Sequence, residues 1–127
     1  MRPPESFTVL VTDSNHHVCN LLQRELEKES YAVHSLKSAN RAYEYLCSSS
    51  RMDLLILDPQ LFHPFDQTII DEILRHHAAT QIILHSYTDI LSGLKTADNI
   101  HQIEKNAASI SSVKSAVHTL FQAFAEK

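Results

Sequence analysis

Short apolar runs recur along the chain, separated by polar segments rich in turn-forming residues. Each run is four or five residues long and consists largely of branched or aromatic residues, which favours a β-strand. The most apolar run, Leu54–Leu57, shows no alternation of polar and apolar positions, as expected of a central parallel strand covered on both faces. The five predicted strands are residues 7–11, 31–35, 54–57, 81–85 and 100–103.

Between these runs, apolar residues return every three or four positions, which is the spacing of an amphipathic helix. The pattern predicts helices at 14–29 and 38–47, a helix capped by Asp66, a short helix at 89–95 and a final helix that begins at Ser109. Residues 48–50 are predicted to form a loop. The side chains expected to face inward are Val18, Leu21, Leu22, Leu26, Ala42, Tyr43, Leu46, Ile69, Ile70, Ile73, Leu74, Ile110, Val113, Val117, Leu120, Phe121 and Phe124.

Strands that alternate with helices across short loops require parallel strands and right-handed crossovers. We therefore expect an α/β fold, an open five-stranded parallel sheet with helices on both faces. A chain of 127 residues fits one domain, so we expect a single domain over residues 1–127 with its core at about 5–124. In such sheets the functional site lies at the carboxyl ends of the strands.

Four polar residues follow the predicted strands at that edge: Asp13, Asp58, Ser86 and Lys105. Two carboxylates at one rim suit Mg²⁺, which prefers oxygen ligands and a phosphate. With the metal present, Asp58 can attack an activated phosphoryl group and form an aspartyl phosphate. Lys105 would neutralise charge on the phosphoryl oxygens, and Ser86 would donate a hydrogen bond to the bound group.

The composition excludes several other classes of site. Gly93 is the only glycine, which rules out a P-loop, a dinucleotide-binding glycine motif and a nucleophile elbow. A net charge of −4 argues against nucleic-acid binding and a basic membrane-binding face, and no apolar run is long enough to span a membrane. Cys19 and Cys47 lack a CxxC spacing and are expected to be reduced thiols.

The nine histidines do not form a recognisable metal motif, since no histidine has another at i+4 and HExxH is absent. We expect them at the surface and at helix ends, where His76 and His77 suit the C-terminus of a helix. Ser86 has no glycine-rich oxyanion loop and is not expected to be a hydrolytic nucleophile. His85 points to the opposite face of its strand and is not expected to act as its base.

With these strand ends, the sequence resembles the receiver domains of bacterial two-component response regulators over about residues 5–124. The resemblance rests on VLVTD at 9–13, DLLILD at 53–58, IILHS at 82–86 and IEK at 103–105. It implies a flavodoxin-like doubly wound sheet in the order 2-1-3-4-5. It also implies that Asp58 is the phosphoacceptor, that Asp13, Asp58 and the Gln60 carbonyl bind Mg²⁺, and that Ser86 and Lys105 contact the phosphoryl group.

The sequence departs from that family at several positions. Ser14 stands where a second acidic residue is usual, so we expect weak Mg²⁺ binding. Pro59 removes a backbone donor next to Asp58. Asn106 stands where proline usually follows the lysine, and Gln102 replaces a common aromatic switch residue. The stretch between Ser86 and Lys105 is also short, which predicts a truncated fourth helix.

The resemblance implies a cytoplasmic signalling switch rather than a classical enzyme. Its expected partner is a histidine kinase or a histidine phosphotransfer protein, with no nucleic acid or membrane bound by this domain. A homodimer through the face of helix 4, strand 5 and helix 5 is a further expectation. The alternative is a degenerate pseudo-receiver, a phosphorylation-independent protein interaction module, which Ser14, Pro59 and Gln102 favour.

Overall fold

The computed structural model describes residues 2–48 and 52–126, and its five strands form one parallel sheet in the order β2-β1-β3-β4-β5. This confirms the predicted fold class and strand order. The strands are β1 (Thr8–Thr12), β2 (Ala32–Leu36), β3 (Leu54–Leu57), β4 (Gln81–Ser86) and β5 (Ile100–Glu104). The helices are α1 (His16–Glu27), α2 (Ala39–Leu46), α3 (Gln67–His76) and α4 (Ser109–Ala125), with short 3₁₀ turns at Pro4–Ser6 and Pro59–Leu61.

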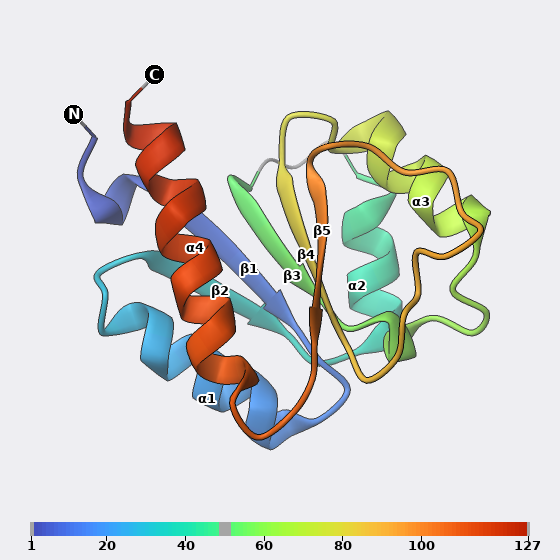
Figure 1. Cartoon of the computed structure of the whole chain (residues 1–127), viewed down its shortest axis with the longest axis horizontal. Coiled ribbons are helices and arrows are strands. Elements are labelled where there is room, and N and C mark those ends of the chain that lie inside the picture. The colour runs from blue at the N-terminus through green and yellow to red at the C-terminus, as the bar shows by residue number, and fades with distance from the viewer. Residues whose placement is uncertain (1, 49–51, 127) are drawn as a thin grey trace.

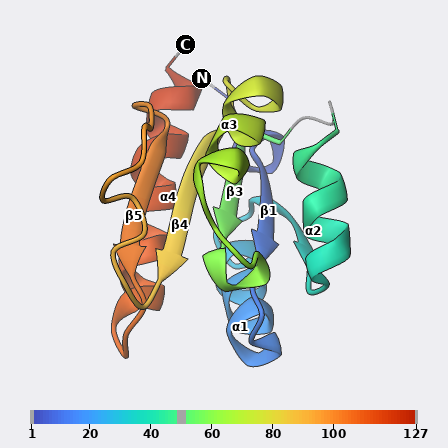
Figure 2. The ribbon, with the colours of Figure 1, turned by 90° about the vertical axis from the view of Figure 1, so that its right-hand side faces the viewer.

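Helices α1 and α4 cover one face of the sheet, and α2 and α3 cover the other (Figures 1 and 2). The central strand β3 is completely buried and serves both layers, because successive side chains of a strand point to opposite faces. Leu54 and Ile56 join the apolar cluster beneath α1 and α4, whereas Leu55 and Leu57 join the cluster beneath α2 and α3. The continuous apolar run therefore reflects a strand covered on both sides.

Side-chain caps fix where α1, α2 and α3 begin. Asn15 accepts hydrogen bonds from the backbone amides of His17 and Val18 at the start of α1. Ser38 caps α2 in the same way, and Asp66 caps α3 as predicted. In the part of the chain described, no helix is long and apolar enough to cross a membrane.

The predicted short helix at 89–95 is wrong, because residues 87–99 form bends and turns instead. The side chain of Asp89 accepts hydrogen bonds from the amides of Leu91 and Ser92, which holds the backbone in a local turn. Gly93 follows with φ = +80°, a left-handed conformation that ends any helix there. We call residues 87–99 the connecting strap.

One side chain that helical spacing predicts to face inward is exposed instead, and a residue predicted at a helix end is buried there. Tyr43 was expected to face inward but is 46% exposed, because Ala42 and Leu46 define the buried face of α2 and Tyr43 lies about 100° from Ala42. His77 lies at the C-terminal end of α3 as predicted, where it is the C-cap, but its side chain is buried. Of the predicted loop at 48–50, Ser49 and Ser50 lie outside the described residues.

Candidate functional site

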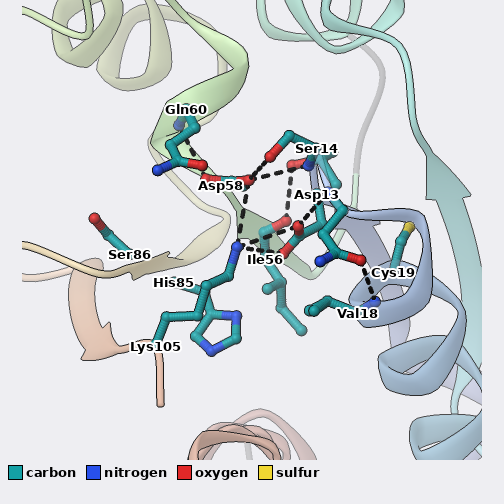
Figure 3. Close-up of polar contacts among 12 residues, drawn as sticks. Asp13, Ser14, Val18, Cys19, Ile56, Asp58, Gln60, His85, Ser86 and Lys105 are labelled. Carbon is teal, nitrogen blue, oxygen red and sulfur yellow. Dashed lines mark hydrogen bonds and ion pairs between the residues drawn. The ribbon is translucent and has the colours of Figure 1, made fainter.

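Three charged side chains meet at the carboxyl edge of the sheet (Figure 3). Val11 of β1 pairs with Ile56 of β3, so Asp13 and Asp58, each two residues further on, emerge side by side. Both carboxylates are completely buried. The Lys105 Nζ lies 3.0 Å from Asp13 Oδ2 and 3.4 Å from Asp58 Oδ2, and thus bridges them.

Backbone pairing positions Lys105 between the two carboxylates. It directly follows β5, and its amide donates to the carbonyl of Ser86 at the end of β4, at 2.8 Å. Its side chain is only 5% exposed. The predicted convergence of the β1, β3 and β5 ends is therefore present in the structure.

Local turns orient the two carboxylates. Asp13 Oδ1 accepts a hydrogen bond from the Asn15 amide at 2.8 Å. Asp58 Oδ1 accepts one from the Gln60 amide at 2.9 Å, since Asp58 caps the 3₁₀ turn Pro59–Leu61. That turn begins at Pro59, which has no N–H. The first residue of the turn that can donate its amide to Asp58 is therefore Gln60.

Ser14 makes the closest contact with Asp58. Its hydroxyl donates to Asp58 Oδ2 at 2.6 Å, and its backbone amide donates to the same oxygen at 3.0 Å. The residue that stands at the expected position of a second acid therefore faces the site and acts there as a hydrogen-bond donor.

The surroundings shift the pKa values of Asp13 and Asp58 in opposite directions. Burial raises the pKa of Asp13, helped by the neighbouring charge of Asp58, and this outweighs the donors Asn15 and Lys105. Burial would also raise the pKa of Asp58. However, hydrogen bonds from Ser14 and the Gln60 amide, with the charge of Lys105, outweigh burial and hold that pKa below its usual value. Asp58 is therefore the carboxylate more firmly held in its ionised form.

Ser86 does not contact the carboxylates. Its hydroxyl donates to the carbonyl of Thr88 at 3.0 Å, and Figure 3 shows it turned away from Asp58. The next residue, Tyr87, is 56% exposed, and its ring centre lies 5.3 Å from the Lys105 Nζ. The aromatic ring thus lies beside the ammonium, in a favourable cation–π contact.

A buried histidine next to the site was not among the predicted site residues. His85 is 1% exposed, and its Nε2 lies 2.9 Å from the Ser109 hydroxyl, which in turn contacts the backbone of Asn106. Burial, assisted by the charge of Lys105, lowers the pKa of His85 to about 4. This neutral network supports the turn that follows Lys105. The signal in the sequence was a histidine that directly follows the apolar run Ile82–Leu84 within a predicted strand.

The donor set fits Mg²⁺ only weakly. Among the described residues no group of three or more His, Cys, Asp or Glu side chains is placed to hold a metal ion. Asp13 and Asp58 supply carboxylates, and Asp13 Oδ2 accepts no well-aligned hydrogen bond from the described residues, although the Lys105 Nζ lies 3.0 Å from it. Ser14 adds only a neutral hydroxyl, and Lys105 already supplies a positive charge at the same position.

No protein-family model matches the chain, and neither does any curated protein sequence. Solved structures do match. A receiver domain from Bacillus halodurans is 18% identical with a TM-score of 0.74, covering 90% of this chain and 96% of that one. The response regulator TrrA from Thermotoga maritima, in complex with Mg²⁺ and BeF, is 21% identical with a TM-score of 0.70, covering 90% and 98%.

A third match is TrrA in complex with the histidine kinase ThkA, at 21% identity and a TM-score of 0.66, covering 90% of this chain and 97% of that one. These likenesses confirm that the chain has the fold of response regulator receiver domains. The low identity agrees with the departures seen in its sequence.

Proposed function

We propose that this chain is a divergent receiver domain of two-component signalling that accepts a phosphoryl group on Asp58. The observation that carries the proposal is the Lys105 ammonium, which lies between the buried carboxylates of Asp13 and Asp58 in a receiver fold. A cation placed there can neutralise a phosphoryl group arriving at Asp58.

The hydrogen bonds favour Asp58 Oδ1 as the attacking atom. Oδ2 accepts from the Ser14 hydroxyl, the Ser14 amide and Lys105, whereas Oδ1 accepts only from the Gln60 amide among the described residues. An oxygen lone pair on Oδ1 would form a bond to phosphorus as the P–N bond of a phosphohistidine breaks, and the electron pair would remain on the departing imidazole. The product is an acyl phosphate on Asp58.

The remaining groups would stabilise that product. Lys105 would move its charge towards the phosphoryl oxygens, and Ser86 would have to leave Thr88 to donate to them. Asp13, Asp58 and the Gln60 carbonyl would hold Mg²⁺. When bound, Mg²⁺ supplies further positive charge for the phosphoryl oxygens.

The proposed partner is a histidine kinase or a histidine phosphotransfer protein, supported by the matching complex of TrrA with ThkA. The role is that of a cytoplasmic switch rather than a classical enzyme, and the net charge of −4 gives no basis for binding nucleic acid. The dimer face predicted to include helix 4 would instead consist of the connecting strap, β5 and α4, since that helix does not form.

A second candidate is a phosphorylation-independent interaction module. It is favoured by the complete burial of Asp58 and by the hydroxyl of Ser86, which is turned towards Thr88. In that case the Asp13–Lys105–Asp58 group would serve only to hold the strand ends together.

Phosphorylation of the purified protein with acetyl phosphate and Mg²⁺ separates the two functions. We expect the intact mass to increase by one phosphoryl group in the wild type and in Asp98→Asn, which alters an exposed residue of the strap. Asp58→Asn should show no increase. An increase that survives Asp58→Asn would show that Asp58 is not the acceptor, and no increase in any folded variant would favour the interaction module.

A further inference from the structure

The hydroxyl of an exposed residue, Ser14, lies against the buried Asp58 carboxylate. Asp58 is completely buried, whereas Ser14, which donates to it, is exposed. The distance of 2.6 Å between Ser14 Oγ and Asp58 Oδ2 is typical of a strong hydrogen bond from a hydroxyl to a carboxylate. Ser14 thus lies between Asp58 Oδ2 and solvent.

The direction of this hydrogen bond decides what Ser14 does. A hydroxyl that binds a cation offers its oxygen lone pairs and points its hydrogen away. Here the hydrogen points to Asp58 Oδ2, where the Ser14 amide and Lys105 also converge. A cation that needs this oxygen has to displace the hydroxyl before it gains a ligand.

We propose that the Ser14 hydroxyl is a gate on Asp58, which holds Oδ2 in the resting protein and opposes the entry of a divalent cation. This inference rests on the proposed function for the position of the cation beside Asp58. It goes beyond the loss of an acidic ligand, because it assigns the serine an active effect of the opposite sign. Removal of an oxygen from the site should then improve cation binding.

Mg²⁺ binding to the folded protein, measured by calorimetry, tests this inference. Ser14→Ala keeps the backbone amide donor and removes only the hydroxyl. We expect it to bind Mg²⁺ about ten-fold more tightly than the wild type, the factor that corresponds to one hydrogen bond to a charged group. Ser14→Gly should behave in the same way, and Ser112→Ala, at an exposed position in α4, should bind like the wild type.

Equal or weaker binding by Ser14→Ala would overturn the gate, since the hydroxyl would then be neutral or a ligand. The same conclusion would follow if neither protein bound Mg²⁺. Phosphorylation by acetyl phosphate is scored separately on the same samples. Tighter Mg²⁺ binding by Ser14→Ala, with no phosphorylation of either protein, would support the gate and refute the proposed function. Phosphorylation of both proteins, with equal Mg²⁺ affinity, would support the proposed function and refute the gate.

Discussion

The carboxylate site and the connecting strap lie close together but are held by opposite kinds of contact. At the site, Asp13, Asp58 and Lys105 are buried and interact through full charges. In the strap, the backbone of exposed residues is held by neutral side-chain amides from α3 and β5. The first arrangement is stiff and costly to disrupt, whereas the second can be released at small energetic cost.

The strap is fastened at both ends. Gln67 forms a pair of hydrogen bonds with the backbone of Lys95, at 2.8 and 2.9 Å. Gln102 donates to the Thr88 carbonyl at 2.8 Å and accepts from the Ile90 amide at 3.2 Å. Gln102 stands where receiver domains commonly have an aromatic residue, and it supplies both a donor and an acceptor, which an aromatic ring cannot do.

The largest effect is expected from Lys105→Met, which tests the stiffness of the site. It would leave two buried carboxylates without their shared cation, so the free energy of unfolding should fall by about 3–5 kcal/mol. Lys114→Met is the matched control, since Lys114 is 30% exposed and pairs with Glu25, for an expected change of about 0–1 kcal/mol. Urea denaturation measures the free energy of unfolding of both variants. Equal losses would show that the buried ion pairs of Lys105 stabilise the protein no more than an exposed ion pair.

Acidification should lower the free energy of unfolding, because His85 is held neutral in the folded protein. The folded state holds its pKa at about 4, below the value of 6.5 expected when unfolded. The unfolded chain therefore takes up a proton first as the pH falls, so stability present above pH 6.5 is lost towards pH 4. The difference corresponds to roughly 3 kcal/mol, which the raised pKa of Asp13 partly opposes.

Urea denaturation across that pH range measures the loss. His85→Gln keeps a donor near Ser109 without titrating and should show a flatter pH dependence. His118→Gln, at an exposed position, should behave like the wild type. The same pH dependence in all three proteins would contradict the assignment to His85.

Ser14→Asp tests how far added charge strengthens the site. Relative to Ser14→Ala, a third carboxylate near the cation should improve Mg²⁺ binding by about 1–2 kcal/mol, roughly ten-fold, after solvation and repulsion between ligands offset most of the Coulomb gain. Since this variant also lacks the hydroxyl gate, calorimetry should rank it above Ser14→Ala. Equal affinities of the two variants would mean that the new charge does not reach the cation.

The smallest effect is expected in the strap. Gln102→Ala removes two neutral hydrogen bonds and should lower stability by about 1 kcal/mol. Hydrogen exchange at the Ile90 amide should accelerate, while exchange within β3 changes little. Gln122→Ala, at an exposed position in α4, is the control. Acceleration spread equally over the whole sheet would show that the strap does not open independently.

The sequence predicted the sheet because its signals are local. The run Leu54–Leu57 is apolar enough to indicate a central strand, and the polar residue after each strand locates the site edge. Parallel pairing then brings Asp13, Asp58 and Lys105 together without further information.

The strap and the directions of the site hydroxyls depend on contacts between distant residues. Gln67 lies 28 positions from Lys95, so no local pattern could show that it would bind the strap. Ser14 was placed at the site, yet its bond to Asp58 depends on a partner 44 positions away. The short spacing between Ser86 and Lys105 indicated a truncated fourth helix, but it could not show that the Ser86 hydroxyl would donate to the Thr88 carbonyl.

The buried side chain of His77 joins α2 and α3, the two helices on one face of the sheet. Its Nε2 lies 3.2 Å from the Tyr45 carbonyl and 3.1 Å from the Leu46 carbonyl, and its ring stacks on Tyr45 at 5.0 Å. Two carbonyls require the nitrogen to be the donor, and burial keeps the imidazole neutral by lowering its pKa. The C-cap residue of α3 thus completes the C-terminal end of α2, so a substitution that displaces one of these helix ends should also disturb the other.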